Sequence, residues 1–258
     1  MKIHLPHIKL IMKKILLFSI FTWISCLLIA QNNLDTTQLI VSPKKKVAID
    51  LSNRANDHFL LQWGYTKWAG KPDTINTSGM SKSFNVYFMF DYPFKTNPKL
   101  SMAFGPGISS DHILFTKTYV GIKDATAAIH FNNVSDTNHF KKTKLATAYL
   151  EAPVEFRYSS NPISGIGFKA AIGVKVGTLI TAHTRNTKFQ NKNNQSLNDF
   201  VMKESSKRFF NKNRLSVTGR LGYGHFTLYG SYQVTPLFKD GLGPVVKPFS
   251  IGITLSGL

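Results

Sequence analysis

The sequence predicts an all-β protein, an eight-stranded antiparallel up-and-down transmembrane β-barrel that follows a cleaved signal peptide. Three observations predict this fold: long segments alternate apolar and polar residues, eight such segments can be counted, and short connections alternate with long ones. Successive side chains of a strand point to opposite faces, so each segment has one apolar and one polar face. A soluble sheet packs its apolar face on a core, whereas a transmembrane barrel turns that face to lipid and its polar face inward.

The clearest pair of strands lies between Lys144 and Ile180. A turn at residues 159–164 joins them, and each strand exceeds the roughly 9–11 residues that cross a bilayer at a tilt. One face of the first strand carries Ala146, Ala148, Leu150, Ala152, Val154, Phe156 and Tyr158, and the matching face of the second carries Phe168, Ala170, Ile172, Val174, Val176 and Ile180. The opposite faces hold charged and small residues, as expected for the lumen of a narrow barrel.

The same alternation predicts six further strands, which are His58–Trp68, Ser81–Tyr92, Leu100–Lys117, Asn213–Tyr223, Phe226–Val234 and Pro248–Leu258. We expect Leu100–Lys117 to pass through a β-bulge near Ser110 and Asp111. The polar segments 118–142 and 185–211 are predicted to be long loops. Short turns follow the second, fourth and sixth strands, which predicts that both chain termini lie in the periplasm.

The N-terminal region has the features of a targeting signal. Lys13 and Lys14 precede an apolar run that ends at Ala30, which predicts a signal peptide over residues 1–30, with Met12 as an alternative start. Residues 31–57 then form a periplasmic lead-in, and residues 58–258 form the outer-membrane barrel. A lipoprotein attached at Cys26 and a retained signal anchor stay open as alternatives. Cys26 is the only cysteine, so the cleaved chain would contain no disulfide.

The chain is strongly basic, with a net charge of +19. Residues 1–30 hold four lysines and no acid, so +15 of that charge belongs to the remainder. Such a charge would ordinarily indicate nucleic acid, which an exported protein rarely meets. The expected partners are outer-membrane lipid and lipopolysaccharide, and simple solvation of loop lysines is the alternative.

Charged residues on the inward faces predict an ion-paired network in the lumen. Its members are Asp91, Glu151, Glu155, Arg157, Lys169, Lys175, Arg214 and Arg220. With the hairpin turn centred near Asn161 and Pro162, Glu155 would face Lys169, and Glu151 would lie near Lys175. Opposed charges on paired strands stabilise by about 0.2–1 kcal/mol, and an unpaired buried charge costs considerably more. Eight strands enclose room for side chains or one small ligand, so we expect a filled lumen without a pore.

The predicted loop 185–211 interleaves basic residues with phenylalanines. Its cations are Arg185, Lys188, Lys192, Lys203, Lys207 and Arg208. This composition would suit an anionic lipid headgroup, a glycan or a partner protein. The alternative is a solvated loop whose phenylalanines hold it to the barrel rim.

No catalytic, cofactor-binding or metal-ligating set is predicted. A hydrolase would need a nucleophile or base beside a histidine at the outer rim. His112, His130, His139 and His183 fall in or near the predicted outer loops, but none has a partner that the sequence can place, and none has zinc-ligand spacing.

One strand also carries a family resemblance. Residues 149–158, Tyr-Leu-Glu-Ala-Pro-Val-Glu-Phe-Arg-Tyr, together with residues 167–173 and 250–254, resemble the PorT-like outer-membrane β-barrel proteins of Bacteroidetes-type bacteria. The resemblance covers roughly residues 58–258 and implies an eight-stranded barrel without known catalytic residues or a cofactor. Some members of that family accompany type IX secretion and gliding machinery. The chain ends in Leu258 and so lacks the C-terminal aromatic residue of many proteobacterial barrels.

These observations together predict an outer-membrane barrel with a side-chain-filled lumen, which acts as a monomer in a structural or binding role and not as an enzyme. A small pore or transporter is the first alternative. An accessory component of a type IX-like secretion machinery is the second, and envelope proteins would then be its partners.

Overall fold

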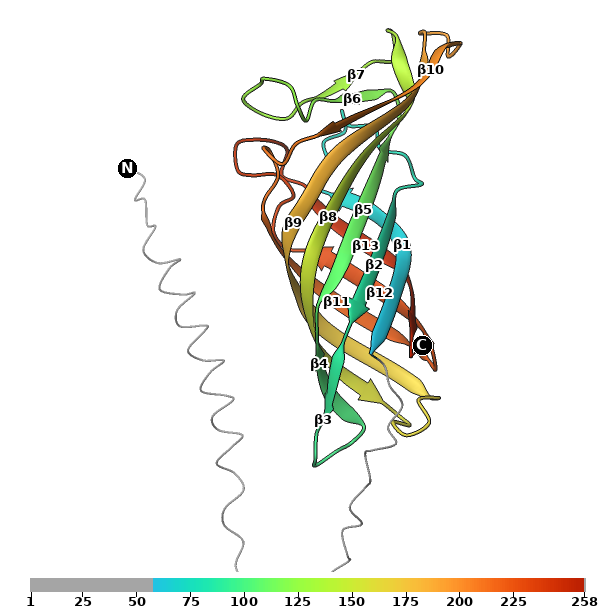
Figure 1. The fold of residues 1–258 in the computed structure, drawn as a ribbon, viewed down its shortest axis with the longest axis vertical. Coiled ribbons are helices and arrows are strands. Elements are labelled where there is room, and N and C mark those ends of the chain that lie inside the picture. The colour runs from blue at the N-terminus through green and yellow to red at the C-terminus, as the bar shows by residue number, and fades with distance from the viewer. Residues whose placement is uncertain (1–57, 258) are drawn as a thin grey trace, which may run out of the picture. The chain divides into compact units, whose positions relative to one another are not determined.

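The computed structural model describes residues 58–257, which form strands and connections without a helix (Figure 1). The strands are β1 (Phe59–Ala69), β2 (Lys82–Phe88), β3 (Phe90–Pro93), β4 (Leu100–Phe104), β5 (Gly107–Phe115), β6 (Thr118–Val120), β7 (Phe131–Asn133), β8 (His139–Ser159), β9 (Phe168–Gln190), β10 (Ser196–Ser205), β11 (Asn213–Tyr223), β12 (Phe226–Gln233) and β13 (Lys247–Ser256). Within residues 58–257 no helix is long and apolar enough to cross a membrane. The predicted signal peptide and lead-in lie outside the described residues.

A closed ring of eight strands confirms the predicted fold class. The ring runs β8-β9-β11-β12-β13-β1-β2-β5, every pairing is antiparallel, and the pairing of β5 with β8 closes it. β3 and β4 continue the lines of β2 and β5 and pair with each other, and β4 also pairs with β8. Closure removes the exposed sheet edges that would otherwise leave backbone groups without partners.

The break in the third predicted strand lies at Gly105 and Pro106, between β4 and β5. The bulge predicted near Ser110 and Asp111 is therefore wrong, because β5 pairs without interruption through both residues. The backbone carbonyl of Phe88 lies so close to Gly105 that a Cβ atom there would collide with it. Pro106 has no N–H to donate, but its carbonyl accepts a hydrogen bond from Phe88 N at 2.9 Å.

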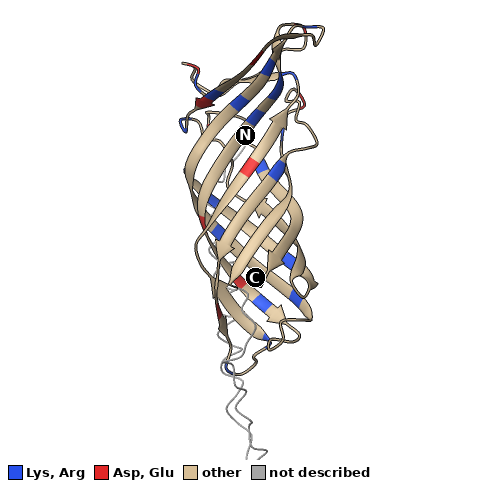
Figure 2. Cartoon of the chain, turned by 45° about the vertical axis from the view of Figure 1, so that its right-hand side comes forward, with Lys and Arg blue, Asp and Glu red and all other residues tan. Residues whose placement is uncertain are grey.

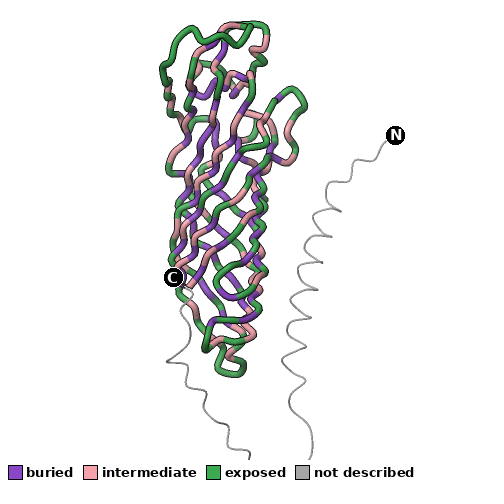
Figure 3. Tube along the Cα trace, turned by 90° about the vertical axis from the view of Figure 1, so that its right-hand side faces the viewer, coloured by how far each residue is buried: buried purple, intermediate pink, exposed green. Residues whose placement is uncertain are grey.

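The side chains alternate between an apolar outer face and a buried inner face, as predicted (Figure 3). On β1, Trp63 is 56% exposed, whereas Leu60 on the inner face is 0% exposed. β11 and β12 repeat the pattern, with Leu221 and Leu228 exposed and Arg220 and Tyr229 buried. An apolar surface that continues around a closed ring is the form that lipid contact requires.

β8 and β9 extend past the ring at the end with the long connections, which we call the outer end (Figure 1). β10 pairs with the last part of β9 as a hairpin, so the prediction of a loop over residues 185–211 is wrong for most of its length. A register shift between Ala148 and Tyr149 interrupts the β8–β9 ladder just beyond Thr178, the last residue of β9 that pairs with β11. In the predicted loop 118–142, β6 pairs with β7 as a small separate sheet.

A folded barrel of this kind predicts heat-modifiable migration on a denaturing gel. The unboiled protein should keep its closed ring and migrate differently from the boiled protein, because the ring has no free edge at which unfolding can begin. The measurement is the migration of the protein from the outer-membrane fraction on a denaturing gel, with and without boiling. Identical migration in the two lanes would contradict the closed barrel.

Candidate functional site

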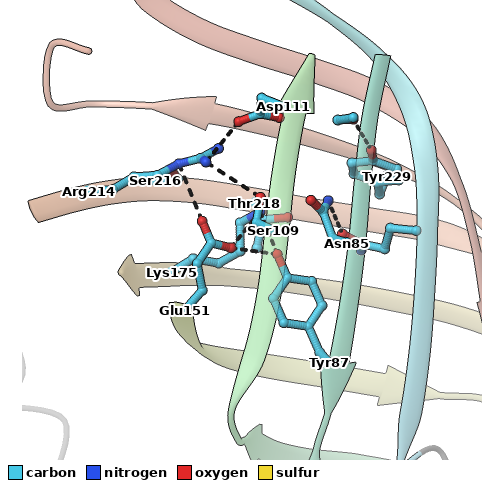
Figure 4. Close-up of polar contacts among 12 residues, drawn as sticks. Asn85, Tyr87, Ser109, Asp111, Glu151, Lys175, Arg214, Ser216, Thr218 and Tyr229 are labelled. Carbon is cyan, nitrogen blue, oxygen red and sulfur yellow. Dashed lines mark hydrogen bonds and ion pairs between the residues drawn. The ribbon is translucent and has the colours of Figure 1, made fainter. Parts of the chain in front are cut away.

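The lumen contains two groups of buried ionic side chains, and the first lies near the middle of the ring (Figure 4). Arg214 from β11 is its central cation. Its Nη1 lies 2.8 Å from Asp111 Oδ2, and its Nε forms an ion pair with Glu151 Oε1 at 3.3 Å without a hydrogen bond. Glu151 Oε2 accepts a 2.6 Å hydrogen bond from the Tyr87 hydroxyl and lies 3.8 Å from Lys175 Nζ. The two negative charges of Asp111 and Glu151 thus balance the two positive charges of Arg214 and Lys175 in the lumen.

The second group lies nearer the short turns and is centred on Glu155. Arg220 donates to both Glu155 oxygens, at 2.7 and 3.2 Å, and Arg157 Nε donates to Oε2 at 2.9 Å. Arg157 Nη1 also lies 3.7 Å from Asp91 Oδ1, which accepts a 2.7 Å hydrogen bond from Ser101. A small cavity with about 30 Å³ of free space lies beside this group. That volume is on the order of one or two water molecules, so it is no channel.

The structure brings the predicted lumen residues together, but it corrects one predicted pair. Glu155 faces Gly173 in the ladder and not Lys169, because the hairpin pairs Ser159 with Lys169. Each partner on β9 therefore lies four residues later than predicted, and the turn is centred two residues later. Lys169 is buried and borders the small cavity.

Three members of the central group were missed by the sequence analysis: Asp111, Tyr87 and Tyr149. The wrongly placed bulge hid Asp111, since an uninterrupted β5 puts it on the same inward face as Ser109 and Ile113. The two tyrosines alternate correctly but were not recognised as polar partners. The guanidinium of Arg214 lies 4.8 Å from the Tyr149 ring centroid, in a cation–π contact.

The wall opposite the ionic groups is neutral and closely packed. Gln62 donates to Thr254 at 3.1 Å and accepts from Asn85 at 3.1 Å. The Tyr229 hydroxyl lies 2.8 Å from the Ser83 hydroxyl and lies over Gly64, where a Cβ atom would approach it to 2.7 Å. Small inward residues thus leave the space that tyrosine rings fill.

A hydrophobic cluster, which we call the outer cap, covers the outer end of the lumen. Every long connection contributes buried residues to it, and its members are Trp68, Ile75, Ile113, Phe115, Val120, Ile122, Ile129, Leu145, Tyr149, Leu179, Ala182, Phe209, Phe210, Leu237, Phe238 and Val246. Trp68 lies at its centre, with ring centroids 5.5 Å from Phe115 and 5.8 Å from Phe238, both edge-to-face. Asn211 joins two of the connections by donating to the carbonyls of Pro236 and Phe238, each at 2.8 Å.

Comparison with known proteins identifies the family. A family model described as "Outer membrane protein beta-barrel domain" matches residues 49–238. The chain belongs to this family. It is an outer-membrane β-barrel protein, in agreement with the closed ring and its apolar outer face. No curated protein matches the chain. Among solved structures, Ail, the attachment invasion locus protein of Yersinia pestis, is similar at a TM-score of 0.34 and 12% identity, over 77% of this chain and 94% of that chain.

The predicted anion-binding residues of this outer-membrane barrel are divided between strands and connections. Arg185 and Lys188 lie on β9, Lys203 lies on β10, Lys192 lies in the turn between them, and Lys207 and Arg208 follow β10. Lys188 Nζ pairs with Asp199 at 3.4 Å on the exposed hairpin. The phenylalanines of this segment take two roles: Phe209 and Phe210 enter the outer cap, whereas Phe189 and Phe200 pack around Phe140 on the hairpin.

The histidines of the outer end form no recognisable catalytic set in the described part of the chain. His130 Nε2 lies 3.0 Å from Asp124, which also accepts a 2.9 Å hydrogen bond from Tyr119. Burial, and then this hydrogen bond, raise the pKa of Tyr119 to about 12, so its phenol stays protonated. Across residues 58–257 no group of three or more His, Cys, Asp or Glu side chains is arranged to hold a metal ion.

Proposed function

We propose that this outer-membrane barrel is a non-conducting structural and binding protein of the cell envelope, and not an enzyme or a pore. The observation that carries the proposal is the outer cap, which lies over a lumen already occupied by ion pairs. An open channel needs a continuous wet path, whereas here buried aromatic rings follow buried ionic groups along the barrel axis. The binding role then belongs to surfaces outside the lumen.

The width of the ring supports the same conclusion. Eight strands enclose an interior that side chains can fill, whereas aqueous channels are typical of rings of sixteen or more strands. Arg214, Glu151 and Tyr87 span the lumen between β11, β8 and β2. A diffusing solute would have to displace partners of a buried charge, which costs several kcal/mol.

Several finer features belong to the same proposal. The strand at residues 149–158 supports membership of the PorT-like group, and the distribution of short turns supports periplasmic termini. The closed ring supports a monomer, since it has no free edge in the membrane that a second copy would cover. The basic outer end favours lipid or lipopolysaccharide as a partner over nucleic acid.

Single-channel recording in planar bilayers tests the proposal. We expect the folded protein to insert without steady conductance steps at 1 M salt. A variant that lacks the β6–β7 connection, residues 118–133, serves as a comparison, because the ionic groups should still close the lumen without it. Steady, voltage-independent conductance of the unaltered protein would favour the pore and overturn the proposal.

A further inference from the structure

The outer surface of the long strands carries a group of cationic side chains, which we call the cationic band. Its members are Lys82, His112, Lys144, His183, Arg185 and Lys203. They come from β2, β5, β8, β9 and β10, which are consecutive neighbours in the sheet. Figure 2 shows Lys and Arg gathered on the upper part of these strands. The band differs from the predicted loop set, of which only Arg185 and Lys203 belong to it.

The strand register places these residues side by side in two cross-strand rows. In one row Lys82 pairs with His112, which pairs with Ala146, which pairs with His183. In the other, Lys144 pairs with Arg185, which in turn pairs with Lys203. Directly opposed residues lie about 4.5–5.5 Å apart at Cβ, and like charges there are destabilising. A row of three directly opposed cations therefore needs an anion from elsewhere.

Strand alternation fixes the band on the outward face. Ala182 and Thr184, which flank His183 on β9, are buried at 0% exposure. Thr143 and Leu145, which flank Lys144, are buried as well, so the cations between them point away from the lumen. The band is thus separate from the ion pairs inside the barrel.

No carboxylate neutralises the band within residues 58–257. The ion pairs of the outer end are Lys188 with Asp199 and His130 with Asp124, and neither includes a member of the band. Glu204, the acid next in sequence to Lys203, alternates to the opposite face of β10 and acts electrostatically on Tyr119 there. The charges also act on each other: burial, and then the positive charges of Arg185 and Lys203, hold the pKa of the Lys144 ammonium below its usual range.

The band adjoins the apolar belt that faces lipid. Lys82 lies two residues beyond the exposed Phe84 on β2, a rise of roughly 7 Å along the strand. Its Nζ lies 5.7 Å from the ring centroid of Trp63, an exposed aromatic of the kind that marks a membrane interface. His112 lies four residues beyond the exposed Ile108 on β5, a rise of roughly 13 Å. The cations therefore begin where the hydrocarbon layer ends.

We propose that the cationic band is a binding site for the phosphate groups of a phosphorylated glycolipid in the outer leaflet, with Lys144, Arg185 and Lys203 as its main phosphate ligands. The apolar belt below would hold the acyl chains, and the rows above would hold the headgroup. A guanidinium can bind a phosphate through two parallel hydrogen bonds, and ammonium groups add point charges beside it. The site assigns a class of ligand to the binding role proposed above, and it rests on that proposed function.

Lipid retention in mixed micelles tests the site. The folded full-length protein is captured from detergent micelles with increasing mole fractions of diphosphoryl lipid A, and the retained lipid is measured per barrel. The triple variant Lys144→Gln/Arg185→Gln/Lys203→Gln should need an at least roughly tenfold higher mole fraction for half-saturation, since each Lys or Arg near an anionic surface contributes on the order of a fivefold factor. Lipid A with its phosphates removed should bind the unaltered protein as weakly as diphosphoryl lipid A binds the variant.

A matched control removes the same charge elsewhere. The variant Lys95→Gln/Lys99→Gln/Lys123→Gln alters exposed cations outside the band and should retain lipid as the unaltered protein does. An equal loss in both variants, or no loss in the first, would overturn the site. Full displacement of the lipid by an equal concentration of inorganic phosphate would also overturn it, because the ligand would then be a soluble anion.

Two checks keep the outcome interpretable. Each variant must keep the heat-dependent gel shift, and the single variant Lys203→Gln on β10, outside the ring, replaces the triple variant if that one does not fold. Retention without a difference between variants, together with absent conductance, would remove the lipid site and leave the non-conducting barrel standing. Steady conductance with normal lipid retention by the unaltered protein would overturn the non-conducting barrel and leave the lipid site standing.

Discussion

Replacing Glu151 with alanine is expected to lower the free energy of unfolding by about 3–5 kcal/mol, because it leaves Arg214 and Lys175 buried without this carboxylate. Both cations are within 4 Å of Glu151, at 3.3 and 3.8 Å, and Tyr87 loses the acceptor of its 2.6 Å hydrogen bond. The measurement is the urea midpoint of unfolding in a fixed detergent or lipid, with the heat-dependent gel shift as a second reading.

The control variants separate charge from packing. Glu151→Gln keeps the size of the side chain and an acceptor for Tyr87 but removes the charge, so it should destabilise less than alanine. Adding Lys175→Met to Glu151→Ala should recover part of the lost stability, since it removes one of the two buried cations that have lost Glu151 as a partner. An unchanged urea midpoint for Glu151→Ala would contradict the ion-paired network.

Replacing Trp68 with alanine is expected to lower the free energy of unfolding by about 3–5 kcal/mol, because it removes the central ring of the outer cap. Trp68 is 7% exposed and contacts the rings of Phe115, Phe131 and Phe238. The loss should also raise proteolysis of the outer connections, since the cap is what binds them to one another.

Trp63 provides a matched control on the same strand. It faces outward and is 56% exposed, so Trp63→Ala removes an equal volume without opening a cavity in the cap. We expect its cost in unfolding free energy to be smaller and its outer connections to stay resistant to protease. Equal protease sensitivity of the two variants would contradict the role of the outer cap.

Alternation alone predicted the wall of the barrel well. A period of two determines which residues face outward, and it did so correctly for Trp63, Leu221 and Leu228 and for the buried Arg220. It also placed the charged residues on the inward face, because a lipid-facing charge is costly in any register. The distribution of short and long connections then predicted the order of the ring.

The pairing register of the strands and the positions of their breaks were predicted less well, because alternation along one strand does not determine them. A hairpin shifted by four residues keeps every side chain on its face, so Glu155 could be assigned to Lys169 when it actually faces Gly173. The break at Gly105 depends on how closely Phe88 approaches, which is a property of a neighbouring strand. Moving that break to Ser110 concealed Asp111, the carboxylate that Arg214 binds at 2.8 Å.

The sequence by itself thus determined the fold class, the face of most side chains and the polar character of the lumen, since these follow from periodicity along one strand. Only the tertiary structure decided the partners of each charge, the outer cap and the cationic band. Lys144, Arg185 and Lys203 are separated by 40 and 17 residues in sequence and become one row through strand pairing. The members of the cap come from separate polar connections and from the strand ends beside them, and their burial arises from the meeting of these segments above a closed ring.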